Sequence, residues 1–167
     1  MLHAMRKRMG DDKGFTLIEL MVVVLIIAIL IAIAIPTFLG LRSRAQNRSA
    51  QSDLRNGLTA GKAFYTDADT YGDGAGGVAD FDATAGLAVE PALEWVGNVT
   101  PTAGQVAIKQ AAGTSLFLVT LSQSATFYGL GDINGTTVYC KATTAGTIPA
   151  DAAACQTAGG TSTAAWA

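Results

Sequence analysis

The residues that could do chemistry lie close together near the N-terminus. Gly14 precedes Phe15, and Glu19 stands just before sixteen consecutive apolar residues, Leu20–Ile35. If residues 15–35 form a helix, that helix is about 32 Å long at ~1.5 Å per residue, enough to cross a hydrocarbon core of ~30 Å. A carboxylate in such a span costs roughly 2.5–3.5 kcal/mol or more at the membrane centre and less near its surface. Glu19 is therefore a candidate functional residue, and the span is a candidate membrane anchor.

The segment before the apolar run has the character of a targeting signal. Residues 1–14 contain four bases, two acids and no apolar block of their own, which is typical of the charged region of such a signal. Beyond the run, Pro36 and its neighbours offer no small-residue cleavage motif. A cut between Gly14 and Phe15 is the alternative, and it would leave the span in the mature chain. Taken singly, Gly14 could be a flexible joint and Glu19 a side chain that reaches the cytoplasmic surface.

The string Gly-Phe-Thr-Leu-Ile-Glu that begins at Gly14, followed by the apolar run and Pro36, resembles the prepilin signature of type IV pilins and pseudopilins. The resemblance implies that a prepilin peptidase cuts after Gly14 and N-methylates Phe15. It also implies that Glu19 serves assembly by pairing with the N-terminal amine of a neighbouring subunit. Pro36 should kink the helix, because proline lacks a backbone donor. Ala28 departs from the pattern, since many members have a glycine midway along the run.

The bases on either side of the span do not fix its orientation. Three arginines follow the span closely and nearly balance the four bases before it, so the positive-inside rule gives no clear answer. The resemblance implies a cytoplasmic N-terminus, a single pass through the inner membrane before assembly, and then an extracellular filament. The partners that it implies are identical subunits, the prepilin peptidase, the pilus assembly platform and the inner membrane.

The pattern after Pro36 changes to that of an amphipathic helix. Between residues 37 and 65, apolar or small side chains recur at near-helical spacing with charged side chains between them. We therefore expect one helix of up to about fifty residues, from the span to Tyr65. Gly57 and Gly61 are one turn apart, and they either let a sheet approach the helix closely or are simply tolerated.

Strand signals follow an irregular connection at residues 66–98. They lie at residues 105–110, 115–122, 126–133 and 136–142. Asn134-Gly135 is a type I′ hairpin signal between the last two. We predict an α+β, pilin-like fold in which the long N-terminal α-helix packs on a 3–4-stranded antiparallel sheet. The predicted segments are a leader at 1–14, a membrane and filament-core half of the helix at 15–36, an amphipathic half at 37–65 and a globular head at 66–167.

The irregular connection is acidic. Asp67, Asp69 and Asp73 belong to a group of five aspartates with no base among them. Their oxygens could ligate calcium, but the spacing misses the EF-hand pattern. Solvated loop acids explain the group better, and we expect neither a metal site nor a cofactor.

Two cysteines lie near the C-terminus. Cys140 and Cys155 enclose fourteen residues that are rich in Ala and Thr. In the pilins that the chain resembles, a C-terminal disulfide commonly fastens such a loop to the sheet. An exported chain also favours a bridge over two free thiols. A bridged loop of that size contributes about 3 kcal/mol in the chain-entropy model.

The remaining side chains offer few groups suited to catalysis or to nucleic-acid binding. Cleavage after Gly14 would remove His3, which is the one histidine, and a bridge would leave no thiolate nucleophile. A net charge of -2 gives no strongly basic surface. We therefore expect no enzyme and no clear nucleic-acid site. The resemblance implies a structural subunit of a type IV pilus, with a pseudopilin of a type II secretion system as the alternative. Adhesion, motility and DNA uptake are all roles that such a filament serves.

Overall fold

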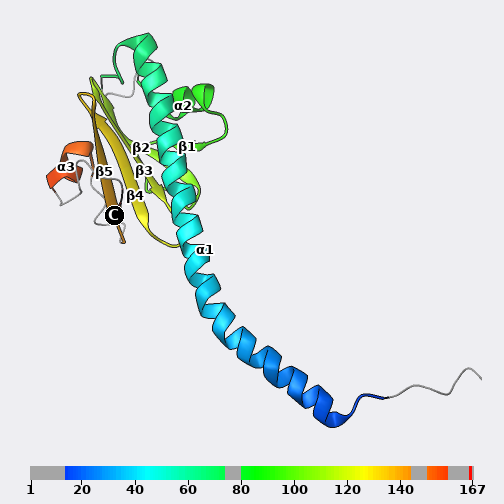
Figure 1. Cartoon of the computed structure of the whole chain (residues 1–167). Helices are drawn as coiled ribbons and strands as arrows, with labels where there is room; N and C mark the ends of the chain where they lie inside the picture. The colour runs from blue at the N-terminus through cyan, green and yellow to red at the C-terminus, as the bar shows by residue number, and fades with distance from the viewer. Residues whose placement is uncertain (1–13, 74–79, 144–149, 158–165, 167) are drawn as a thin grey trace, which may run out of the picture. The chain divides into compact units, whose positions relative to one another are not determined.

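The computed structural model describes residues 14–73, 80–143, 150–157 and Trp166 (Figure 1). The chain divides into two compact units, residues 1–41 and residues 42–167. Helix α1, Leu17–Ala68, contributes residues to both units. The proposed leader lies outside the described residues except for Gly14.

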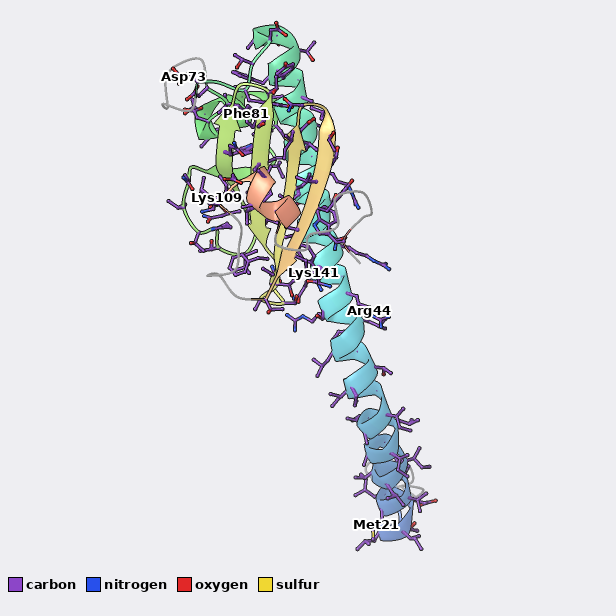
Figure 2. The ribbon with its side chains drawn as sticks, turned by 90° about the vertical axis from the view of Figure 1, so that its left-hand side faces the viewer. Met21, Arg44, Asp73, Phe81, Lys109 and Lys141 are labelled. Atoms are coloured by element: carbon purple, nitrogen blue, oxygen red, sulfur yellow. A yellow bond between two sulfur atoms is a disulfide. The ribbon has the colours of Figure 1, made fainter. Side chains whose placement is uncertain are left out.

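The first unit is the N-terminal part of α1. Every residue from 14 to 41 is exposed, and side chains project from the helix all around Met21 (Figure 2). By length and composition α1 could cross a membrane. The helix passes through Pro36, which cannot donate to the carbonyl one turn back. Next to it, the Thr37 hydroxyl donates to the carbonyl oxygens of Ile33 and Ala34 at 3.1 and 2.9 Å.

The second unit is built on a five-stranded sheet in the order β1-β2-β3-β4-β5. Strand β1 pairs with β2 in parallel, and the other neighbours are antiparallel. The strands are β1 Glu94–Val96, β2 Gln105–Ala112, β3 Ser115–Leu121, β4 Phe127–Ile133 and β5 Thr136–Ala142. The α+β class is confirmed and four antiparallel strands are present, but the sheet has a fifth strand, the parallel β1, which the sequence did not predict. The extra strand has three residues, too few for the alternating pattern by which strands are recognised.

The four strands that the sequence predicted are present, within two residues at each end. The hairpin between β4 and β5 turns at Asn134 and Gly135, whose φ angles are 50° and 82°. Both central residues of a type I′ turn need positive φ, and Asn and Gly adopt it most readily. The local turn signal therefore fixed the register of this pair.

The segment at 66–98 is more regular than expected. Helix α1 continues to Ala68, and a second helix, α2, spans Ala83–Val89. The Asp82 carboxylate caps α2 by accepting from the Ala85 N–H at 2.8 Å. Seven residues are too few to show a helical period, so this helix depends on its cap and on packing rather than on pattern.

Residues 50–61 of α1 pack against one face of the sheet. The buried helix residues are Ala50, Leu54, Gly57, Leu58, Ala60 and Gly61. A Cβ at Gly57 would lie 3.1 Å from Leu118 Cδ1, and one at Gly61 would overlap Leu116 Cδ2. The two glycines therefore permit a close approach of helix and sheet. The opposite face of the sheet carries helix α3, Ala152–Thr157 (Figure 1).

Candidate functional site

The first turn of α1 is closed by a reciprocal pair of side chains. The Thr16 N–H and hydroxyl both donate to Glu19 Oε2, at 2.9 and 2.7 Å. The Glu19 N–H donates to Thr16 Oγ1 at 3.2 Å. This is a capping box, in which two backbone donors at the start of a helix are satisfied at once. Glu19 therefore has a local structural role in addition to any role between subunits.

Sequence reasoning missed Thr16. A Thr three residues before a Glu, directly ahead of an apolar run, is the sequence signature of a capping box. The signature was present, but Glu19 was considered only as an isolated carboxylate. The helix N-terminus carries partial positive charge, which also favours a carboxylate in the first turn. These two effects explain why a charged residue is tolerated at the start of an apolar helix.

The predicted cleavage residues lie just before this capping box. Phe15 has 92% of its surface exposed, and Gly14 is also exposed. Neither residue is part of α1, which begins at Leu17. A Cβ added to Gly14 would meet no atom within 4 Å. Nothing in the described part of the chain therefore requires a glycine at this position.

The weak calcium candidates are not brought together. In the residues that the model covers, no group of three or more His, Cys, Asp or Glu side chains could hold a metal ion. Asp67 lies at the C-terminal end of α1, and Asp69 follows it with a φ of 56°. The Asp73 N–H donates to Asp80 Oδ1 at 2.6 Å. Of these acids, Asp69 and Asp73 lie in the turn after α1, which the Asp80 carboxylate helps to close.

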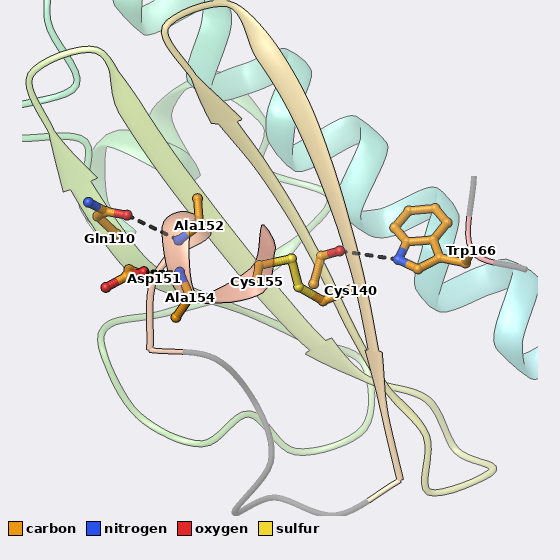
Figure 3. Close-up of a disulfide and its surroundings, with 8 residues drawn as sticks. Gln110, Cys140, Asp151, Ala152, Ala154, Cys155 and Trp166 are labelled. Atoms are coloured by element: carbon orange, nitrogen blue, oxygen red, sulfur yellow. Dashed lines mark hydrogen bonds between the residues drawn. A yellow bond between two sulfur atoms is a disulfide. The ribbon is translucent and has the colours of Figure 1, made fainter. Parts of the chain in front are cut away.

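The two cysteines are joined as predicted. Cys140 on β5 and Cys155 on α3 form a disulfide with their Cα atoms 5.8 Å apart (Figure 3). Both residues are buried, at 6% and 0% exposure. Two further contacts hold α3: the Ala154 N–H donates to Asp151 Oδ1 at 2.6 Å, and the Ala152 N–H donates to Gln110 Oε1 at 3.3 Å. The bond fastens α3 to the sheet face opposite α1.

Trp166 provides a second C-terminal anchor that the sequence did not reveal. Its indole N–H donates to the Gly129 carbonyl at 3.1 Å (Figure 3). Its ring stands edge-on to Tyr128 and Tyr139. The Arg55 guanidinium of α1 lies 5.1 Å from the ring centroid, within cation–π range. Trp166 therefore joins α1 to β4 and β5. The available signal was one large aromatic residue in a tail of small residues.

An ion pair between an exposed lysine and a buried aspartate joins α1 to β4. Lys62 Nζ lies 2.9 Å from Asp132 Oδ2, and the side chains are 47% and 5% exposed. Among the described residues, Asp132 Oδ1 has no hydrogen-bond partner. Burial, the negative charge of Asp132 and neighbouring Tyr65 raise the pKa of Tyr71 to about 12. The arrangement ties the C-terminal part of α1 to the sheet.

Comparisons with known proteins give one matching family model and several similar proteins. Residues 9–35 match a family model described as the prokaryotic N-terminal methylation motif. The chain is 39% identical over 101 residues to the type IV major pilin protein PilA of Myxococcus xanthus, covering 60% of this chain and 43% of that one. It is 40% identical over 63 residues to the type IV wide pilus major component PilA4 of Thermus thermophilus, covering 38% and 48% of the two chains.

A secretion protein matches over a shorter stretch. The type II secretion system core protein G of Vibrio cholerae is 42% identical over 48 residues, which cover 29% of this chain and 33% of that one. The chain thus spans less than half the length of each of these three relatives. No solved structure matches it.

Proposed function

We propose that the chain is a member of the type IV pilin family and a structural subunit of a type IV pilus, on the basis of the matched N-terminal methylation motif and the pilins to which it is similar. The observation that carries the proposal is the string at residues 14–19 leading into a fully exposed apolar helix. Exposed apolar side chains along a whole helix need lipid or other helices around them. A subunit that moves from the membrane into a filament core provides both in turn.

Processing is the first step of the proposed function. A prepilin peptidase would cut after Gly14 and N-methylate Phe15, leaving residues 15–36 as the membrane and filament-core segment. The bond between these residues precedes α1 and is exposed, so a protease could reach it without unwinding the helix. A glycine that no contact with the described residues requires is consistent with recognition by an enzyme whose site has no room for a side chain.

Pairing of Glu19 is the second step. In the described part of the chain, Thr16 donates to one of the two Glu19 carboxylate oxygens, Oε2. The other oxygen, Oε1, is left to accept from another group. Cleavage creates a cationic amine on Phe15 that did not exist before. Glu19 of one subunit would pair with that amine on its neighbour. An unpaired carboxylate is costly away from water, whereas a paired one is tolerated and fixes register.

Mass spectrometry of sheared surface material tests the whole proposal. The expected result is an abundant extracellular chain that begins with N-methylated Phe15. An unprocessed chain, or one cut beyond the apolar run, would contradict the processing step. The prepilin peptidase, the assembly platform and identical subunits are the partners that such a filament requires. Neither a catalytic role nor a cofactor is part of the proposal.

A pseudopilin of a type II secretion system is the second candidate, because core protein G of Vibrio cholerae matches part of the chain. Such a subunit would remain in the envelope instead of accumulating outside the cell. Calcium-dependent thermal stabilisation would also favour this alternative, whereas the disulfide between Cys140 and Cys155 favours the pilus.

A further inference from the structure

Three of the four asparagines in the chain begin the pattern Asn-x-Ser/Thr. The patterns start at Asn47, Asn98 and Asn134, and no middle position is a proline. This pattern is the acceptor signal for an N-linked oligosaccharide, and it is used where it lies on the surface of an exported protein. The proposed filament function places the residues after the membrane span outside the cytoplasm. The surroundings of each asparagine then decide which of them the folded chain leaves suited to carry a sugar chain.

Asn134 lies at the tip of the β4–β5 hairpin. The last paired residues of the two strands are Ile133 and Thr136, so the turn between them extends past the paired residues. Asn134, Gly135 and Thr136 are all exposed. A Cβ added to Gly135 would meet no atom within 4 Å. A bulky group on Asn134 would therefore enter solvent without displacing a buried side chain.

The hydrogen bonding of the Asn134 side chain leaves its amide nitrogen available. The Thr114 hydroxyl, in the turn before β3, donates to Asn134 Oδ1. Among the described residues, none hydrogen-bonds to Asn134 Nδ2. The nitrogen is the atom that an N-linked sugar would occupy. The amide is thus oriented through its oxygen, and the acceptor atom stays free.

Asn47 is a poor acceptor in the folded chain. It lies within α1 and is half-buried. Its Oδ1 accepts from the Ser124 hydroxyl at 2.5 Å, so its side chain faces the turn between β3 and β4. A sugar chain on Asn47 would have to be placed between α1 and that turn.

Asn98 is exposed, but its surroundings differ from those of Asn134. It is one of the residues that line a hollow beside β2, together with Asp82 and Lys109. The threonine of its pattern, Thr100, directly precedes Pro101, which restricts the backbone of the preceding residue. Asn134 has neither constraint, because its pattern lies in a turn that projects from the sheet.

We propose that Asn134 is a glycosylation site and carries an oligosaccharide through its side-chain nitrogen. The inference rests on the proposed function, which exports this part of the chain. The donor is an oligosaccharide joined to a lipid pyrophosphate, and another enzyme catalyses the transfer. Asn134 Nδ2 forms a bond to C1 of the first sugar and loses one proton. The bond between C1 and the pyrophosphate oxygen breaks, and the lipid pyrophosphate leaves.

Mass spectrometry of the mature chain, purified from the cells that make it, tests the inference. After reduction, trypsin releases residues 110–141, in which Asn134 is the one asparagine. This peptide should carry the mass of one oligosaccharide, and fragmentation that preserves sugars should locate that mass on Asn134. A peptide 110–141 without added mass overturns the inference. Added mass on a serine or threonine of this peptide, with Asn134 unmodified, also overturns it.

Matched variants, each expressed in place of the wild-type chain, test the acceptor signal. N134D removes the amide nitrogen but keeps an oxygen for Thr114 and a turn sequence that type I′ turns favour. T136V removes the hydroxyl of the pattern. Both variants should lose the whole added mass, whereas T136S and the control N47D should keep it. Retention of the added mass by N134D or T136V, or its loss from N47D, overturns the assignment to Asn134.

The same spectra separate this inference from the proposed function. An extracellular chain that begins with N-methylated Phe15 and has an unmodified Asn134 overturns the glycosylation and leaves the pilus function standing. A chain that is neither processed nor exported overturns the pilus function, and the glycosylation fails with it.

Discussion

The two parts of helix α1 reach stability by different means. From residue 17 to residue 41 every side chain is exposed, so the helix has only its own backbone hydrogen bonds and its capping box. From residue 50 to residue 61 it buries Leu54 and Leu58 and lays two glycines against the sheet. An isolated helix in water is marginal, and tertiary packing normally supplies its stability. The exposed part therefore depends on contacts from outside the chain, whereas the packed part is stabilised by contacts with the sheet of its own chain.

Substitution of Glu19 should have the largest effect, and only on the exposed part. We expect E19A to be processed normally and to lower the yield of sheared filaments by at least about 100-fold, on the basis that losing one partner of a buried charge pair costs ~3–5 kcal/mol. Quantitative immunoblots of sheared and cell-bound material measure this.

Two further variants separate the two roles of Glu19. E19Q keeps an acceptor for the capping box but removes the charge, whereas T16V removes the cap and keeps the charge. If charge pairing matters most, E19Q should resemble E19A and T16V should be milder. Normal filaments from E19A would remove Glu19 from the mechanism.

Removal of the disulfide should have the next largest effect, confined to the packed part. The variant C140S/C155S should lose about 3 kcal/mol of unfolding free energy, as expected for a closed loop of ~15 residues. Denaturant unfolding of the full chain in detergent, followed by tryptophan fluorescence, measures the loss. The helical signal from residues 17–41 should stay unchanged. An unaltered midpoint would mean that α3 is held by its other contacts alone.

Glycine substitutions compare the two parts of α1 directly. G61A places a Cβ against Leu116 Cδ2, so it should destabilise the packed part by about 1–3 kcal/mol. G40A is its matched control, because a Cβ there meets no atom within 4 Å. Alanine favours helix over glycine by ~0.5–1 kcal/mol, so G40A should be neutral or stabilising. The same unfolding measurement distinguishes them, and equal losses would refute the close approach of helix and sheet.

The smallest expected effect is a pH dependence of the unfolding free energy of the packed part. Burial and Asp132 raise the pKa of Tyr71 to about 12, compared with 10.0 for an ordinary tyrosine. The folded state thus favours the neutral phenol, and that stability is complete below pH 10 and is lost as pH rises toward 12. The unfolding free energy of the wild-type chain should fall relative to that of Y71F as the pH rises from 10 toward 12, because Y71F has no phenol to ionise. Parallel curves would contradict the raised pKa.

The sequence predicts features that depend on local chemistry. The apolar run, the helical spacing after Pro36 and the Asn134-Gly135 turn each encode their structure within a few residues, and the model agrees with all three. Strand β1 and helix α2 were missed because both are short and are stabilised by contacts outside their own residues: β1 pairs with β2, and α2 rests on Trp95.

In the candidate site, too, local sequence signals could be recognised and contacts between separate elements could not. Gly14, Phe15 and Glu19 were selected from a contiguous string, whereas the role of Thr16 was overlooked although its signature is equally local. Trp166 could not be placed, because its partners Arg55, Tyr128 and Tyr139 come from separate elements. A tail with one aromatic residue does not specify where that residue binds.

The two C-terminal anchors also determine how the packed part bears mechanical load. Tension applied along α1 enters the sheet through Leu54, Leu58 and the Arg55–Trp166 contact. From the sheet it passes to α3 through a covalent bond between Cys140 and Cys155. The link between the sheet and α3 is covalent, whereas the contact between α1 and the sheet is not. A stretched subunit should therefore yield first at that contact, with the sheet and α3 still joined.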